Sequence, residues 1–107
     1  MRYAIVLAPT AVRELRALPA HVRARVADEL ERHLRHQPTK VSKSRLKRLR
    51  GLSRPQFRLR IDDIRVFYDV TDTAVEVLTI ISKAQAAEWL REQGRSEPGG
   101  ALGEGEG

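Results

Sequence analysis

Cysteine is absent from the 107-residue chain, and aromatic residues and long apolar runs are scarce. Without cysteine there is no disulfide framework, no thiolate metal site and no cysteine nucleophile. The absence fits a reducing compartment, and we expect a cytoplasmic location. No apolar run approaches the roughly 20 residues that a membrane span requires, and the first apolar stretch is too short for a secretory signal. We therefore expect a small domain with no membrane partner.

Glycine is also scarce in most of the chain. Six of the seven glycines lie within residues 94–107, and only Gly51 precedes them. This distribution excludes a glycine-rich phosphate loop and a dinucleotide fingerprint. The same terminal segment lacks apolar residues to bury, so we predict one domain over residues 1–93 and a disordered Gly/Glu-rich tail over 94–107.

Positive charge is concentrated in one segment. Residues 40–65 contain ten Lys or Arg and two Asp, a net charge of +8 in a chain whose total is +6. Such a segment favours an anionic partner, either nucleic acid or an acidic protein segment; the alternative is a solvated basic surface. The residues of this segment that we expect to bind nucleic acid are Lys43, Arg45, Lys47, Arg48 and Arg50.

Hydrophobic periodicity predicts helices in the first third of the chain. Residues 2–7 alternate as in a short strand, and Thr10 is a candidate N-cap for the helix that follows. Pro19 suits the first turn of a second helix, so the short break between the two patterns predicts an antiparallel helical hairpin. The second helix carries an apolar stripe with Ala27 beside it, formed by Val22, Val26, Leu30 and Leu34.

The period changes to two after the basic stretch 39–54. Two alternating segments flank the turn candidate Asp62-Asp63, and a nearly all-apolar segment follows, as expected of a central strand. These patterns predict an α+β domain, β-α-α-β-β-β-α, whose helical hairpin packs on one face of a mostly antiparallel four-stranded sheet. The predicted later elements are strands at 56–61, 64–70 and 75–81 and a short helix at 84–91.

The hairpin register has a consequence for its arginines. With Asp62-Asp63 as the loop, Arg60 is directly opposite Arg65, and like charges in that arrangement cost stability. Either Asp62, Asp63 or Asp69 neutralises the pair, or the arginines form an anion site beside an aromatic ring, suited to phosphate binding with base stacking. The side chains that we expect together on the exposed face are Gln56, Arg58, Arg60, Arg65 and Phe67.

No metal site is expected. His33 and His36 are spaced to chelate, but no acid or cysteine cluster completes a ligand set, so we interpret them as surface or helix-end residues. Trp89 is expected to be a packing anchor; the alternative is that it stacks on a base.

The stretch LKRLRGL…FRLRIDDIRVFYDV…VEVLTIISK, with the opening strand and helical hairpin, resembles the RelE/ParE superfamily of bacterial toxin–antitoxin toxins. The resemblance covers roughly residues 2–93. Its most specific parts are Leu49-Arg50-Gly51, the hairpin from Arg58 to Tyr68 and the last strand ending in Lys83. The resemblance implies the RelE-like fold.

In the RelE branch, the resemblance implies a toxin that enters the ribosome and cuts mRNA without a metal or other cofactor. The 2′-hydroxyl attacks the adjacent phosphate, and cationic groups stabilise the charge of the transition state. The catalytic residues implied position by position are Arg58, Arg60 and Arg65, with Lys83 as a substitute cation or acid.

The chain departs from this pattern after the last strand. Ala84 stands where an arginine is common in RelE-type toxins, and Trp89 and Leu90 stand near the position of a tyrosine. Three functions therefore remain: ribosome-dependent mRNA cleavage, ParE-like binding of DNA gyrase without chemistry, and a non-toxic RNA- or protein-binding module. The hairpin arginines favour the first, and the two departures favour the others.

The resemblance also implies a cognate antitoxin. We expect an acidic segment, disordered when alone, that folds over the basic cluster. Its acids would neutralise Arg58, Arg60 and Arg65.

Overall fold

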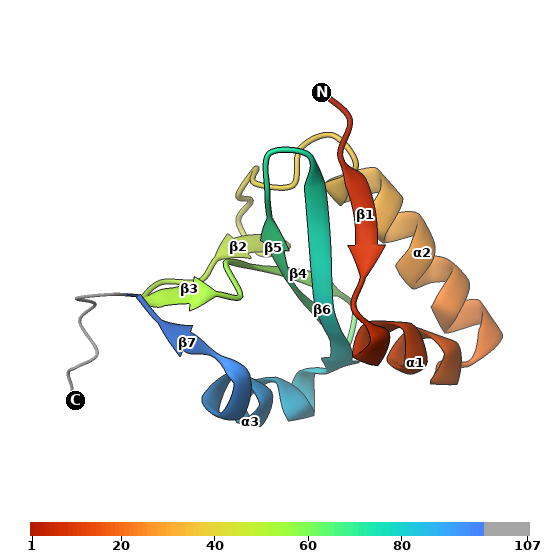
Figure 1. The fold of residues 1–107 in the computed structure, drawn as a ribbon. Helices are drawn as coiled ribbons and strands as arrows, with labels where there is room; N and C mark the ends of the chain where they lie inside the picture. The colour runs from red at the N-terminus through yellow and green to blue at the C-terminus, as the bar shows by residue number, and fades with distance from the viewer. Residues whose placement is uncertain (98–107) are drawn as a thin grey trace.

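The computed structural model describes residues 1–97 (Figure 1). Secondary structure covers most of this range. The elements are β1 (Ala4–Leu7), α1 (Pro9–Ala17), α2 (Ala20–Leu34), β2 (Leu46–Arg48), β3 (Leu52–Arg54), β4 (Phe57–Ile61), β5 (Ile64–Val70), β6 (Ala74–Ser82), α3 (Lys83–Gln93) and β7 (Arg95–Ser96).

The main sheet has five strands in the order β1-β6-β5-β4-β2, and β3 pairs with β7 in a separate two-stranded sheet. β1 runs parallel to β6, and the other pairs are antiparallel. The predicted α+β class is therefore confirmed, with β6 in the interior of the sheet. The sheet has one strand more than the predicted four, because the short β2 pairs with β4 through Leu46 opposite Leu59.

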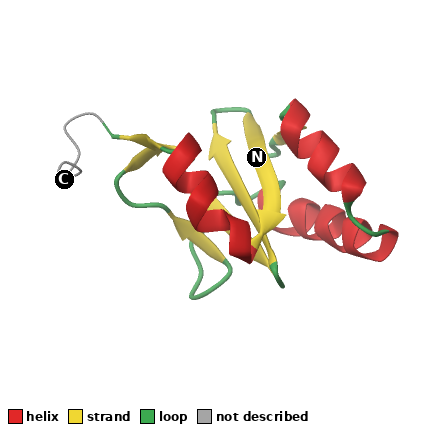
Figure 2. Cartoon of the chain, turned by 90° about the horizontal axis from the view of Figure 1, so that it is seen from below, coloured by secondary structure: helices red, strands yellow, loops and turns green. Residues whose placement is uncertain are grey.

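Helices cover both faces of the sheet. Figure 2 shows α1 and α2 on one side of the strands and α3 on the other. We call these the hairpin-helix face and the α3 face. The helical hairpin was predicted, whereas the position of α3 was not, and this position decides which side chains of the α3 face are exposed.

The core lies between the sheet and the helical hairpin. Val26, Leu30 and Leu34 of the predicted stripe are buried, Val22 is half-buried, and Ala27 is exposed. Val22, Val26, Leu30 and Leu34 pack against apolar side chains that alternate along the strands. Burying such side chains stabilises the fold by about 1.5–3 kcal/mol each. The strand residues of this core include Leu46, Phe57, Leu59, Ile61, Val66, Tyr68, Val75, Val77 and Ile80.

The Tyr68 side chain is part of this core. Its hydroxyl donates a hydrogen bond of 2.6 Å to the carbonyl oxygen of Pro38, and burial raises the pKa of the phenol. The bond satisfies the one polar group that this ring brings into the interior. It also ties the chain after α2 to the middle of the sheet.

Glu14 of α1 completes the edge of β6. β1 ends at Leu7, opposite Val77, so the rest of β6 has no strand on that side. The Glu14 carboxylate accepts hydrogen bonds of 2.8 Å from the Ile80 N–H and from the Thr79 hydroxyl. An acidic side chain thus replaces a strand partner and fixes α1 against the sheet.

The ends of the helices follow local chemistry. α1 begins at Pro9, whose missing N–H costs nothing in the first turn, so the predicted N-cap Thr10 is wrong and Ala8 occupies that position. Pro19 is the N-cap of α2. At the start of α3, the Ser82 N–H donates to Gln85 Oε1 over 3.1 Å.

The ordered chain continues past residue 93. Arg95–Ser96 forms β7 beside β3, which carries the structure into the segment predicted as a tail. The remainder of that predicted tail, residues 98–107, lies outside the described residues. Within residues 1–97, no helix is long and apolar enough to cross a membrane.

Candidate anion-binding face

The β4–β5 hairpin has the predicted register. Arg60 is opposite Arg65, and Arg58 is opposite Phe67. The turn uses Asp62 with φ of 52°, a left-handed conformation that Asp tolerates better than most residues. β2 adds Lys47 opposite Arg58. Because directly opposed residues point to the same face of a sheet, the register places four basic side chains on the α3 face.

The prediction that Arg65 and Phe67 are exposed is wrong. Only 8% of Arg65 and 1% of Phe67 is accessible, because α3 covers this part of the sheet. The rings of Phe67 and Trp89 stack with centroids 5.3 Å apart and planes 3° from parallel. Phe67 is therefore closed to base stacking in this structure, and Trp89 is confirmed as a packing anchor.

Arg65 is held by backbone groups. Its Nη1 donates to the carbonyl oxygens of Asp62 at 2.9 Å and Ile64 at 3.1 Å. These bonds fix the guanidinium beside the turn and give it a structural task. The two carbonyl partners offset part of the cost of holding this buried cation opposite Arg60.

Two of the three acids expected to neutralise the arginines, Asp62 and Asp69, are engaged elsewhere, and the third, Asp63, forms no ion pair among residues 1–97. Asp62 forms a 2.5 Å ion pair with Arg25 of α2, which lowers the pKa of that carboxyl, and the more distant charge of Arg60 acts in the same direction. Asp69 accepts the Gln56 N–H at 2.8 Å and lies 3.8 Å from Arg54. Within residues 1–97, no carboxylate oxygen lies within 4 Å of the hairpin arginines Arg58, Arg60 and Arg65.

Arg58 is at the centre of this uncompensated charge. It is half-buried, and its Nη2 donates to the Ser44 carbonyl oxygen at 2.9 Å. Its Nε is buried without a partner among the described residues. Burial first, then the charges of Arg65 and Arg60, lower the pKa of this guanidinium. An anion beside Arg58 would offset both the repulsion and the desolvation.

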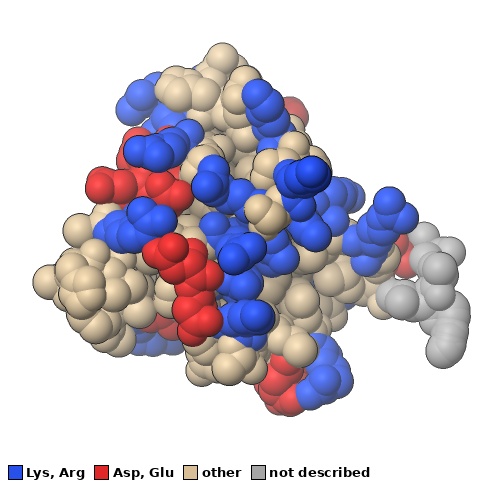
Figure 3. Space-filling view, turned by 180° about the vertical axis from the view of Figure 1, so that it is seen from behind, with Lys and Arg blue, Asp and Glu red and all other residues tan. Residues whose placement is uncertain are grey.

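The other predicted basic residues divide into two groups. Arg48 lies over the Phe57 ring, 5.2 Å from its centroid, and donates to the Gln56 carbonyl oxygen, so it also packs the β2–β4 edge. The remaining ones project into solvent. Figure 3 shows Lys and Arg side chains spread across the middle of one side of the molecule, with acidic side chains beside them. The exposed predicted residues are Lys43, Arg45, Lys47, Arg50, Arg60 and Lys83.

The start of α3 is fixed near the turn end of the hairpin. The backbone N–H of Lys83 donates to the Asp63 carbonyl oxygen at 2.8 Å. The exposed Lys83 side chain therefore begins close to the turn that follows Arg60. Neighbouring Ala84 brings no functional group to this position.

Neither tyrosine serves this face. Tyr68 points into the opposite core, and Tyr3 precedes β1 at the far edge of the sheet. In residues 1–97, no group of three or more His, Asp or Glu side chains is placed to hold a metal ion. Among the histidines, His33 Nε2 lies 3.2 Å from Glu29, a pairing within α2.

Sequence reasoning missed the residues that position the arginines. Arg25 holds Asp62, and the Ser44 carbonyl holds Arg58, over separations of 37 and 14 residues. The pattern of residues along α2 does not indicate the contact between Arg25 and Asp62, because this contact joins the helix to a turn 37 residues away. The covering of Phe67 by α3 also arises from tertiary packing.

The fold and this face define a class of small basic α+β proteins with a cationic hairpin. The sequence model of the family described as "ParE toxin of type II toxin-antitoxin system, parDE" matches residues 5–87. The chain belongs to this family, within the RelE/ParE superfamily of type II toxin–antitoxin toxins. Among curated proteins, none matches the sequence.

Solved toxin–antitoxin complexes contain similar chains. The complex RelBE2 from Mycobacterium tuberculosis has a chain 27% identical with a TM-score of 0.60, covering 77% of this chain and 99% of that one. A chain of the RelE–RelB complex from Pyrococcus horikoshii OT3 is 25% identical with a TM-score of 0.60, covering 79% and 99%. A chain of the RelB–RelE complex from Methanococcus jannaschii shares the fold at 17% identity and a TM-score of 0.58, covering 78% and 96%. These neighbours are toxin–antitoxin complexes.

Proposed function

We propose that this toxin acts on mRNA at the ribosome through the cationic hairpin. The observation that carries the proposal is Arg58, a half-buried guanidinium beside Arg60 and Arg65. Among residues 1–97, no carboxylate oxygen lies within 4 Å of the nitrogen atoms of these three side chains. Structural arginine clusters are normally balanced by acids. An unbalanced cluster is suited to a ligand that brings its own negative charge, and a phosphodiester does so.

The chemistry assigned to the face is electrostatic. In RNA cleavage by the 2′-hydroxyl, the 2′ oxygen bonds to phosphorus while its proton passes to water, and charge accumulates on the phosphate oxygens as the 5′ oxygen departs. Arg58 and Arg60 would stabilise this charge by charge-assisted hydrogen bonds. Lys83 would supply a proton to the departing oxygen, the step for which this chain has no tyrosine available.

A second candidate is inhibition of DNA gyrase by binding. Two observations favour it: the matching family is the ParE toxin family, and α3 covers Phe67 and Arg65, which reduces the open part of the hairpin face. In this candidate the basic surface binds a protein or DNA without chemistry. One set of assays distinguishes the ribosome from gyrase as the target.

The test combines a translating extract with a gyrase assay. Purified toxin is added to the extract and mRNA ends are mapped by primer extension, with and without an inhibitor of translation initiation; supercoiling by gyrase is measured in parallel. We expect cuts that require translating ribosomes. An Arg58→Ala/Arg60→Ala variant should cut at least about 100-fold more slowly, as for the loss of transition-state donors.

The matched control removes the same charge elsewhere. Arg13 and Arg16 are exposed on α1, so Arg13→Ala/Arg16→Ala should cut at the wild-type rate. Gyrase inhibition without mRNA cuts would replace the ribosomal proposal with the second candidate. Neither activity in a folded, monodisperse protein would contradict both.

The antitoxin proposed for this toxin is an acidic segment that covers Arg58 and Arg60. Exposed charges attract over the Debye length of about 8–10 Å, so association should slow as salt rises. Stopped-flow association with the cognate antitoxin at low and high salt measures this. An association rate independent of salt would show that the antitoxin binds elsewhere.

A further inference from the structure

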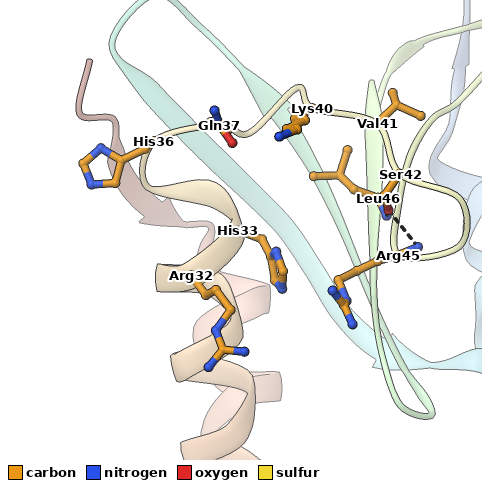
Figure 4. Close-up of a pocket in the computed structure, with 9 residues that line it drawn as sticks. All are labelled: Arg32, His33, His36, Gln37, Lys40, Val41, Ser42, Arg45 and Leu46. Carbon is orange, nitrogen blue, oxygen red and sulfur yellow. Dashed lines mark hydrogen bonds between the residues drawn. The ribbon is translucent and has the colours of Figure 1, made fainter.

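A second cationic site lies away from the α3 face, between the end of α2 and the loop before β2. The hollow has a volume of about 350 Å³, and no Asp or Glu lines it within the described chain. Figure 4 shows the Arg32, His33 and Arg45 side chains converging on this space, whereas the ring of His36 points away. Lys40 and the exposed Val41 complete its rim.

The loop that carries the cations is built by its own hydrogen bonds. Ser42 Oγ accepts the N–H groups of Arg45 at 3.1 Å and Leu46 at 2.9 Å, and the Ser42 N–H donates to the Leu46 carbonyl oxygen at 2.9 Å. Leu46 is buried in the core, so these bonds anchor the loop to the sheet. Arg45 therefore projects from a fixed backbone.

The cations of the hollow differ in their partners. Buried Glu29 lies 3.2 Å from His33 and 3.7 Å from Arg32, so both side chains already have a carboxylate partner. Lys40 and Arg45 have no carboxylate within 4 Å among residues 1–97. Two free cations beside an imidazole ring and an exposed valine suit a phosphate with the sugar and base that adjoin it.

Arg45 connects this hollow to the hairpin. It also lines a neighbouring hollow of about 200 Å³ together with Arg60. The two acids of that hollow are paired, Asp62 with Arg25 and Glu29 with its helix neighbours. The Arg60 N–H donates to the Arg45 carbonyl oxygen at 2.8 Å, which fixes the distance between the two cationic positions. Arg60, Arg45 and Lys40 therefore form a row of basic side chains from the β4–β5 hairpin to the end of α2.

We propose that the Lys40–Arg45 hollow is a phosphate-binding subsite for RNA, which holds a strand whose neighbouring phosphate lies at Arg60. The inference rests on the proposed RNA-directed function. It extends that function by a site on the α2 side of the molecule. This row of cations favours RNA over an acidic peptide for two reasons. Nucleotides present evenly spaced phosphates along one strand, and Val41 and His33 offer a surface on which a base can lie.

The test measures RNA binding without ribosomes and without cleavage. The probe is a fluorescein-labelled single-stranded 12-nucleotide RNA with 2′-O-methyl groups, which lacks the attacking hydroxyl; anisotropy is recorded from low to high salt. Lys40→Gln/Arg45→Gln should weaken binding about tenfold and reduce the slope of log K against log salt by about 1.4, the value for two single-strand phosphate contacts. Lys40→Arg/Arg45→Lys should retain binding.

The control and the competing partner complete the design. Arg13→Gln/Arg16→Gln removes two charges from α1 and should change the slope by less than half as much; circular dichroism and thermal melting verify the fold of each variant. Equal losses in both double variants would overturn the subsite and leave only general attraction. The subsite is also overturned if the Lys40→Gln/Arg45→Gln loss appears with a 12-residue poly-glutamate probe and not with RNA.

Failure of the subsite and failure of the proposed function are distinguishable. If Lys40→Gln/Arg45→Gln binds RNA like the wild type while cleavage in the translating extract still depends on Arg58 and Arg60, the subsite is wrong and the function stands. If cleavage is absent while the binding loss and the slope change occur as expected, the hollow is an RNA site on a protein with another target.

Discussion

The two faces of the sheet bury side chains by different means. The hairpin-helix face presents a continuous apolar surface, in which Leu30, Leu59 and Val66 are almost completely buried. The α3 face is covered by one short helix with no fully buried residue, and its main contact is the stack of Trp89 on Phe67. Basic side chains occupy the rest of that face.

The hairpin-helix face therefore provides most of the stability, and the α3 face carries the basic side chains. A large apolar core offsets an electrostatic cost on the opposite side, because each buried apolar side chain stabilises the fold by about 1.5–3 kcal/mol. In the described part of the chain, the toxin therefore holds Arg58, Arg60 and Arg65 close together without a carboxylate oxygen within 4 Å of their nitrogen atoms. Four comparisons of variants test how far this separation holds.

The largest effect is expected on the hairpin-helix face. Leu30→Asp places a carboxylate in the core and should lower the free energy of unfolding by more than about 3 kcal/mol, enough to abolish soluble expression. Ala27→Asp introduces the same group on the exposed side of α2 and should express normally. Soluble yield and circular dichroism compare the two. A folded Leu30→Asp protein would contradict the assignment of this face as the core.

An intermediate effect is expected where α3 covers the sheet. Trp89→Ala removes the partner of Phe67 and should lower the free energy of unfolding by about 2 kcal/mol, less than for a fully buried tryptophan. Trp89→Phe keeps a stacked ring and should recover most of the loss. Urea unfolding measures both. An unchanged midpoint for Trp89→Ala would mean that α3 adds nothing to stability.

The two opposed arginines should differ in spite of their matched register. Arg65→Ala loses two hydrogen bonds to backbone carbonyls and should cost about 1–2 kcal/mol. Arg60→Ala removes a like charge from Arg58 and Arg65, so its unfolding midpoint should equal or exceed that of the wild type. Thermal melting at constant ionic strength compares the two. Equal losses would show that both arginines are structural.

The smallest effect concerns a carboxyl group. Burial raises the pKa of Asp69, so the folded chain retains this proton to a higher pH than the unfolded chain. The contribution of this group to stability is therefore present at low pH and is lost as the pH rises through the raised value. Asp69→Asn keeps an acceptor for the Gln56 N–H and does not ionise.

At neutral pH, Asp69→Asn should be as stable as the wild type or more stable by up to about 1 kcal/mol. The difference should disappear below the ordinary pKa of Asp. Urea midpoints across the acidic range measure it. A variant that loses stability only at neutral pH would show instead that the 3.8 Å contact with Arg54 dominates.

The hairpin was predictable from sequence because its information is local. Alternation from Phe57 to Val70 and an acidic pair at the turn fixed which residues oppose each other, and the structure has that register. The stripe on α2 was likewise predictable, since one helix face carries it. Both features depend on residues a few positions apart.

Which side chains are exposed on the α3 face was harder to predict from sequence. Burial of Phe67 depends on Trp89, and the position of Arg58 depends on Ser44. The Lys40–Arg45 hollow forms only where the end of α2 lies beside the loop before β2. No periodicity records such contacts, because each is decided by packing between distant segments.

The order of the strands in space differs from their order of synthesis. β6 lies between β1 and β5, and it pairs Ala4 with Ala74 across seventy residues of chain. Contacts of such high sequence separation carry a large loop-closure cost and slow folding. A nascent chain that ends before residue 74 has its basic segment but lacks the strand on which the core closes. The toxin can therefore close its core only after residues 74–82 have been synthesised.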